Sequence, residues 1–291
     1  MNRYQDMFAR LRDKNEGALI PFLMLGDPDP ETSFAQICAV VEAGADALEL
    51  GIPYSDPVAD GPTIVAAANR ALAAGVTPPS ALALVARVRA KYPLLPIGLL
   101  VYGNLVYGSS AHDCSAQDSQ AKAGQAHAEK SAVSGVEHFF AEAKSAGVDS
   151  ILVPDVPVRE SARIRAAGAA TGIDNVFILP PNASAQTQAD VARLSQGYVY
   201  LLSRAGVTGS ETAANMPLEH LVAALSAHHA APAILGFGIS APEHVRGAVQ
   251  AGAAGVIVGS ALVKRLAELV PTASLASVQA YVRNLKAATR Q

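Results

Sequence analysis

The feature that most constrains the fold is a series of eight short apolar runs, each four to seven residues long, spread over most of the chain. They lie at 19–25, 46–51, 97–101, 150–154, 176–179, 198–202, 233–237 and 255–258. Nearly continuous apolar runs of this length are typical of parallel strands that are covered on both faces. The stretches between them, such as 80–92 and 136–147, place apolar residues at helical spacing.

Three junctions between these segments share one pattern, in which a helical stretch ends at Ala-Gly and an apolar run follows. They read AGADALELG (43–51), AGVDSILVP (146–154) and AGAAGVIVG (251–259), and glycine suits the left-handed residue just past a helix C-terminus. Eight strand–helix units predict a single (β/α)8 TIM barrel over residues 1–291. A doubly wound sheet is the alternative, but its first turn more often carries G-x-G-x-x-G, and the first turn here reads GDPDPE.

The composition indicates a globular protein of the cytoplasm. Only 16% of the residues are charged and the formal net charge is −3, which gives no electrostatic footprint for nucleic acid. The N-terminal stretch is charged and lacks the apolar core of a signal peptide, and no run of roughly 18 apolar residues is present to span a membrane. This stretch also places Tyr4, Phe8 and Leu11 on one helical face, which predicts an extra N-terminal helix covering the bottom of the barrel.

Residues 109–134 break the repeating pattern. They contain one large aliphatic residue, Val133, which is too little apolar surface to offset the entropy of ordering the segment. We predict a mobile insertion after the third strand. The insertion does contain residues of the types that bind metals, namely His112, Asp113, Cys114 and His127. Their spacing matches no known metal-binding cluster, so we predict no metal site.

An acidic side chain lies inside the second apolar run, DALELG. Leu48 and Leu50 share a face that suits the helix layer, so strand alternation directs Glu49 into the barrel. The C-terminal ends of barrel strands form the active-site face. Burial there should raise the pKa of the carboxyl group and suit it to donate and accept a proton near neutral pH. The structural alternative is a buried carboxylate that a backbone donor or a tyrosine satisfies.

A second acid, Asp60, lies in the loop SDPVADGP that follows this strand. Asp before Gly is common turn chemistry, and Asp56 before Pro57 has an even stronger turn explanation. The loop begins directly above Glu49, however, and can fold back over the barrel mouth. We therefore predict that Glu49 and Asp60 act as a pair.

Other chemistries lack the residues they need. No lysine lies at the C-terminal end of an apolar run, which leaves a Schiff base without its nucleophile. No histidine lies within a run, so a histidine-built metal site is not expected. Proton transfer by carboxylates remains, with Tyr200 or Tyr102 as an inward-facing phenol.

Glycine-bearing stretches follow the last three apolar runs, at 203–211, 236–240 and 259–263. Gly259 and Ser260 begin a helical pattern, and the partial positive charge at a helix N-terminus favours an anion. A phosphate site after strands seven and eight recurs in this architecture, so we predict a phosphate bound by backbone N–H groups. Between it and the acids, apolar inward residues either fill the barrel core or line a flat pocket for an apolar group: Phe22, Leu100, Tyr102, Ile178 and Phe237.

Several strings in this sequence closely resemble the tryptophan synthase alpha chain family. They are LELGIPYSDPVADGPTI (48–64), PDVP (154–157), YLLSRAGVTG (200–209), GFGIS (236–240) and AGAAGVIVGSALV (251–263). The resemblance runs from RYQDMFARL near the start to LKAATR at the end, apart from 109–134. It implies a lyase that cleaves indole-3-glycerol phosphate to indole and glyceraldehyde 3-phosphate, in a retro-aldol step without Schiff base or metal.

The resemblance also implies roles for single residues. Glu49 handles the proton at indole C3 and on the glycerol side, Asp60 takes the indole N–H, and Tyr200 matches an active-site tyrosine. Thr208 looks like the threonine of a closing lid that pairs with the aspartate. The implied indole pocket contains Phe22, Leu100 and Phe237, and the implied phosphate site contains Gly209, Gly238, Gly259 and Ser260.

A partner and a cofactor arrangement follow from the resemblance as well. It implies no cofactor in this chain and a pyridoxal-phosphate-dependent beta chain as partner, in an alpha2beta2 tetramer in which indole passes through a tunnel. The loop around Asp56 and Pro57 and the segment after Asn104 would contact that partner. The predicted insertion starts a few residues past Asn104 and would alter or extend this interface.

Other functions stay open on the residues alone. A different phosphate-binding barrel, such as an isomerase or epimerase of a sugar phosphate, predicts an inward Lys, His or metal site. A non-catalytic partner that binds ligand and activates a beta chain would be favoured by the loss of either acid, and both are present. A stand-alone lyase that releases free indole is a narrower variant consistent with the sequence.

Overall fold

The computed structural model describes residues 2–108, 135–202, 218–269 and 274–291. The predicted insertion at 109–134 lies outside these residues. So do two predicted ligand-binding residues, Thr208 and Gly209, with the rest of the glycine-bearing stretch 203–211.

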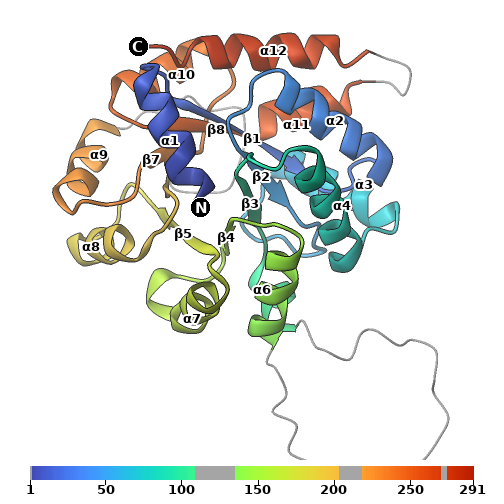
Figure 1. The fold of residues 1–291 in the computed structure, drawn as a ribbon, viewed down its shortest axis with the longest axis horizontal. Helices are drawn as coiled ribbons and strands as arrows, with labels where there is room; N and C mark the ends of the chain where they lie inside the picture. The colour runs from blue at the N-terminus through green and yellow to red at the C-terminus, as the bar shows by residue number, and fades with distance from the viewer. Residues whose placement is uncertain (1, 109–134, 203–217, 270–273) are drawn as a thin grey trace, which may run out of the picture.

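Eight parallel strands pair in chain order and close into a barrel, because the first strand also pairs with the last (Figure 1). They are β1 (Ala18–Met24), β2 (Leu48–Gly51), β3 (Ile97–Leu100), β4 (Ser150–Leu152), β5 (Asp174–Leu179), β6 (Val199–Leu201), β7 (Ala233–Leu235) and β8 (Gly255–Val258). Each predicted apolar run overlaps one of these strands, and the predicted TIM barrel is confirmed.

Helices surround the barrel (Figure 1). They are α1 (Arg3–Asp13), α2 (Pro30–Glu42), α3 (Pro62–Ala73), α4 (Pro78–Lys91), α5 (Gly103–Gly108), α6 (Gly135–Ser145), the 3-10 helix η1 (Val158–Glu160), α7 (Ala162–Thr171), α8 (Ala185–Leu194), α9 (Leu218–Ala227), α10 (Pro242–Gln250), α11 (Ser260–Ala267) and α12 (Ala276–Ala287). Local signals start several of them: Asp29 accepts the N–H groups of the first turn of α2, and Thr77 and Ser80 form a capping box on α4.

The Ala-Gly junctions behave as the sequence predicts. Gly44, Gly147 and Gly252 follow α2, α6 and α10 with φ values of 110°, 91° and 92°. These values lie in the region that side chains with a Cβ atom rarely enter. The three glycines therefore let each helix stop and turn into the next strand.

Helix α1 covers the bottom of the barrel, also as predicted. Tyr4, Phe8 and Leu11 are buried in the core. The Tyr4 hydroxyl lies 2.9 Å from Oγ of Ser150, at the start of β4, and its ring packs 5.5 Å from the ring of Tyr198. The N-terminal helix thus reaches the residues beneath the barrel interior.

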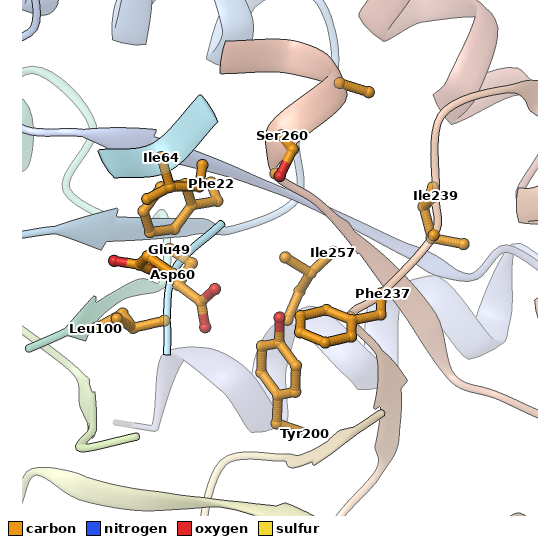
Figure 2. Close-up of a pocket in the computed structure, with 14 residues that line it drawn as sticks. Phe22, Glu49, Asp60, Ile64, Leu100, Tyr200, Phe237, Ile239, Ile257 and Ser260 are labelled. Carbon is orange, nitrogen blue, oxygen red and sulfur yellow. The ribbon is translucent and has the colours of Figure 1, made fainter. Parts of the chain in front are cut away.

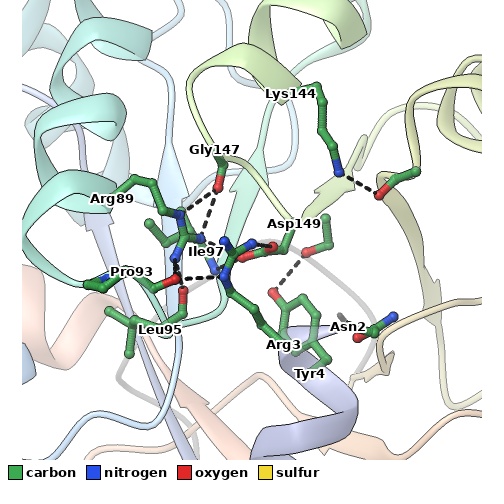
Figure 3. Close-up of polar contacts among 12 residues, drawn as sticks. Asn2, Arg3, Tyr4, Arg89, Pro93, Leu95, Ile97, Lys144, Gly147 and Asp149 are labelled. Atoms are coloured by element: carbon green, nitrogen blue, oxygen red, sulfur yellow. Dashed lines mark hydrogen bonds and ion pairs between the residues drawn. The ribbon is translucent and has the colours of Figure 1, made fainter.

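A charged network fixes α1 to the strands next to it (Figure 3). Asp149 accepts from Arg3 at 2.7 Å and from Arg89 at 2.6 Å, and it also accepts the backbone N–H of Ile97 at 2.9 Å. Arg89 donates further to the backbone carbonyl of Gly147. Each charged group here has a partner of opposite charge, so the barrel floor is stabilised without an unpaired buried charge.

Within the described parts of the chain, no single helix is long and apolar enough to cross a membrane. One bent pair, α3 with α4, passes by length and composition, with a bend of 101° between its halves.

Candidate active site

Strand β2 carries Glu49 into the barrel interior. Its neighbours in register are Phe22 of β1 and Gly98 of β3, while Leu48 and Leu50 point the other way and are fully buried. The Glu49 side chain lines a cavity at the C-terminal ends of the strands, and 1% of the residue is exposed (Figure 2). The predicted inward direction of Glu49 is confirmed.

A tyrosine hydroxyl donates a hydrogen bond to one oxygen of the Glu49 carboxylate. Tyr198, just before β6, donates to Oε1 at 2.9 Å. Burial raises the pKa of Glu49 from 4.5 to about 7, the Tyr198 hydrogen bond opposes this rise, and the nearby charge of Asp60 adds to it. Glu49 therefore exchanges its proton close to neutral pH, which is the range that general acid–base catalysis requires.

Asp60 lies at the edge of the same cavity, beside Glu49 (Figure 2). It ends the loop that connects β2 to α3, and Gly61 and Pro62 start α3 directly after it. Burial raises the pKa of Asp60 from 3.8 to about 6, and a hydrogen bond with Tyr102 opposes the rise. Because the pKa of Asp60 lies below that of Glu49, Asp60 loses its proton at lower pH and is better suited to act as a base, while Glu49 keeps a proton to donate up to higher pH.

Tyr102 has a different place from the one predicted. It is not among the residues that line the cavity; its hydroxyl accepts the N–H of Ala59 at 3.1 Å and bonds to the Asp60 carboxyl group. Its ring stacks on Tyr54 at 5.4 Å. Tyr102 follows the last residue of β3, where strand alternation no longer fixes the direction of a side chain. It supports the Asp60 loop from outside the cavity.

The opposite end of the cavity is built from backbone. Gly238 of the loop after β7 lines it, together with Gly259 and Ser260 at the start of α11, while Gly236 lies beside the Tyr200 ring. The first turn of a helix leaves N–H groups without intrahelical acceptors and carries partial positive charge. Gly238 has φ 78°, which a residue with a Cβ atom adopts only at a cost. This end has the features of an anion site.

Apolar side chains fill the space between the two ends. Phe22, Leu100 and Phe237 line the cavity as predicted, and Ile257 lies at its centre (Figure 2). Tyr200 projects into it from β6 (Figure 2). Ile178 lines an adjoining cavity, which shares Asp60, Leu100, Tyr200 and Phe237 with the first. The arrangement suits a ligand with an anionic end and a flat apolar end.

Some residues of the site do not appear in the sequence prediction. Tyr198, which bonds Glu49, is the most important, and it stands two residues before Tyr200 on the same face of the chain. That spacing indicates that Tyr198 shares the inward face with Tyr200, but it does not identify Glu49 as its partner. Ile64 of α3 also lines the cavity, but it belongs to a helix outside the barrel, and strand patterns carry no information about it.

The part of the chain that the structure describes contains no group of three or more His, Cys, Asp or Glu residues arranged to hold a metal ion. The lysines within those ranges lie on helices or at a helix end: Lys14, Lys91, Lys144, Lys264 and Lys286. Cys38 is buried on α2.

Comparison with known proteins gives a consistent result. The family model described as tryptophan synthase alpha chain matches residues 8–125 and 130–290. The tryptophan synthase alpha chains of Photobacterium profundum and of Escherichia coli strain SMS-3-5 are each 49% identical over 292 aligned residues. The alignments cover 100% of this chain in both cases, and 99% and 100% of those proteins respectively.

Solved structures agree with this assignment. A chain of Mycobacterium tuberculosis tryptophan synthase superposes with a TM-score of 0.83 at 31% identity, covering 100% of this chain and 99% of that one. The alpha chain of Legionella pneumophila subsp. pneumophila gives 0.78 at 27% identity, with 99% and 97% covered. The barrel, the two acids that the sequence predicts to act together, and the full-length identity to these relatives lead to one conclusion: this chain belongs to the tryptophan synthase alpha chain family, and is a lyase of tryptophan biosynthesis.

Proposed function

We propose that Glu49 and Asp60 cleave indole-3-glycerol phosphate by acid–base catalysis, with the phosphate held at the glycine end of the cavity. The observation that carries this proposal is the convergence of both acids on one cavity whose far end is formed by Gly238, Gly259 and Ser260. The apolar walls between them accommodate an indole ring. Membership in the family supports the same substrate.

The proton transfers can be assigned from the two environments. Glu49, with a pKa of about 7, protonates C3 of the indole ring, and Asp60, with a pKa of about 6, takes the proton from N1, which gives an indolenine. Glu49 then accepts the proton of the side-chain hydroxyl next to C3. The bond between C3 and the glycerol carbon breaks, its electron pair returns to the ring, and N1 regains its proton. The products are indole and glyceraldehyde 3-phosphate.

Tyr200 and Tyr198 take different parts in this scheme. Tyr200 lines the cavity and contacts the bound ring. Tyr198 holds the Glu49 carboxylate from below and favours its ionised form, because it donates a hydrogen bond to Oε1. Thr208 and Gly209 remain proposed members of the lid and phosphate site by family resemblance, and lie outside the described residues.

We also propose a beta-chain partner, in an alpha2beta2 tetramer. The name of the family implies such a partner. Val58, at 74% exposure in the Asp60 loop, and Tyr107, at 40% exposure on α5, place apolar surface beside the barrel mouth, close to the predicted contact residues Pro57 and Asn104. The proposed reaction uses no cofactor in this chain, and pyridoxal phosphate is expected only in the partner.

Indole release from purified chain tests the proposal. Glu49→Gln and Asp60→Asn should each lower kcat/KM by at least about 10²-fold, because each removes a positioned proton-transfer group. Glu219→Gln on α9 and Asp6→Asn on α1 remove exposed acids of the same types and serve as matched controls. Near-wild-type turnover in either active-site variant would remove that residue from its role. Adding a beta chain should raise the rate if the partner couples to this site.

A further inference from the structure

The anion end of the cavity is made of two elements that are separate in the chain. One is the loop from Gly236 to Ala241 between β7 and α10, and the other is the start of α11 at Gly259 and Ser260. Backbone N–H groups can bind one anion together only if these two elements keep a fixed distance and direction. Pairing of β7 with β8 brings the two elements side by side, but that pairing runs only as far as Leu235 and Val256. Contacts beyond the strands are therefore needed to fix the direction of the loop relative to α11.

Helix α12, near the C-terminus, packs against α10 and α11, the helices that follow β7 and β8 (Figure 1). Its half-buried Tyr281 contacts the loop after β7 and the last turn of α11. The Tyr281 hydroxyl donates to the backbone carbonyl of Ser240 at 3.0 Å, two residues after Gly238. The guanidinium of Arg265, on α11, lies over the Tyr281 ring at 4.2 Å from its centroid. One side chain thus joins the loop after β7 to the helix after β8.

His244 adds a second contact to the same loop. It is in the first turn of α10, and its Nδ1 lies 3.3 Å from both the backbone N and the Oγ of Ser240. The backbone N–H donates to Nδ1, so this ring nitrogen is unprotonated when the bond is made. Ser240 is thereby held through its N–H by His244 and through its carbonyl by Tyr281.

We propose that Tyr281 is a positioning residue for phosphate, which keeps Gly238 and the start of α11 aligned on one anion. This inference rests on the proposed phosphate site. Tyr281 does not line the cavity, so it acts through Ser240 and Arg265 and not on the substrate. Its loss should weaken binding of the anionic end of a ligand and leave both the apolar end and the proton transfers unchanged.

Calorimetric titration of the full-length chain with inorganic phosphate, with glycerol 3-phosphate and with indole tests this inference. Tyr281→Phe keeps the ring beneath Arg265 and removes only the hydroxyl. It should raise the Kd for both phosphate compounds about 3- to 10-fold, the effect of one net hydrogen bond, and leave the Kd for indole within twofold. Tyr281→Leu also removes the stacking surface and should raise the phosphate Kd further. Tyr92→Phe, which removes the hydroxyl that bonds Glu42 on the outer helix layer, is the matched control.

The outcomes separate a positioning role from a structural one. Unchanged phosphate binding in Tyr281→Phe, equal weakening for indole and phosphate, or absence of phosphate binding by the wild-type chain would each overturn the inference. With indole-3-glycerol phosphate as substrate, KM should rise as the phosphate Kd does while kcat stays within twofold. If the wild-type chain released no indole, the proposed reaction would fail, but the phosphate titrations would still decide the role of Tyr281.

Discussion

Replacing Glu49 by glutamine should make the folded protein more stable at pH 8 and have a much smaller effect at pH 4.5. In the folded chain the carboxyl group is buried with one hydrogen-bond donor from Tyr198, and its pKa rises from 4.5 to about 7. One pKa unit corresponds to about 1.4 kcal/mol. Ionising Glu49 in the folded protein therefore costs about 3 kcal/mol more than ionising it in the unfolded chain.

The sign of the pH dependence of stability follows from whether the folded or the unfolded state binds more protons. Below pH 4.5 Glu49 is protonated in both states and contributes no pH dependence. Between pH 4.5 and 7 it is ionised in the unfolded chain and still protonated in the folded protein, so the free energy of unfolding falls as pH rises. Above pH 7 Glu49 is ionised in both states, and the free energy of unfolding falls no further on its account. Glutamine keeps an oxygen that accepts from Tyr198 but has no charge to desolvate.

Urea unfolding at several pH values measures the effect. The free energy of unfolding of Glu49→Gln minus that of the wild type should increase by about 3 kcal/mol between pH 4.5 and pH 8, most of it between pH 5 and 7. The control is Glu31→Gln. Glu31 is exposed and its pKa is lowered by a hydrogen bond from Arg87, so its titration lies below this window and its difference should stay flat. A flat difference for Glu49→Gln would refute the burial of an ionisable group at this position.

Two other changes probe the cavity and the floor. Gly236→Ala would place a Cβ atom against the ring of Tyr200, so the ring must shift. We expect the free energy of unfolding in urea to fall by about 1–3 kcal/mol and kcat/KM for indole release to decrease. Wild-type values of both quantities would contradict the close packing. Asp149→Asn removes the charged partner that Arg3 and Arg89 share on the barrel floor. It should lower the free energy of unfolding by about 3 kcal/mol and leave kcat/KM of the folded protein unchanged. A selective loss of activity would mean that the floor also shapes the site.

The parts of the site that lie on strands were predictable from the sequence. Strand alternation has a period of two, so the apolar neighbours Leu48 and Leu50 fix the direction of Glu49. The Gly-Ser pair before a helical pattern likewise marked the start of α11 at Ser260. Both signals are local, and the closed barrel converts them into positions in space because every strand ends at the same face.

Contacts between elements distant in the chain were not predictable in this way. The Tyr198 hydroxyl reaches Glu49 across the barrel interior, from the residue just before β6, a strand that does not pair with β2. Tyr102 lies beyond the end of β3, where alternation stops, and it turns toward Asp60. Tyr281 lies on an outer helix and touches the loop after β7 and helix α11 at once. Each depends on three-dimensional packing that a periodic pattern does not encode.

Charged groups are paired at the floor of the barrel, whereas the acid Glu49 at the mouth has no cationic partner among the residues that the structure describes. The floor therefore contributes to stability and the mouth to catalysis. At the floor, Asp149 is matched by two guanidinium groups, so the interactions of its charged form are satisfied. At the mouth, Glu49 has a neutral donor and a second acid nearby, and burial outweighs the hydrogen bond from Tyr198. A cation beside Glu49 would stabilise the fold but would pull its pKa well below neutral. The carboxyl group could then no longer protonate carbon near pH 7. The unfavourable burial of Glu49 is therefore what makes its proton available, and the paired charges at the floor supply stability where they do not affect that proton.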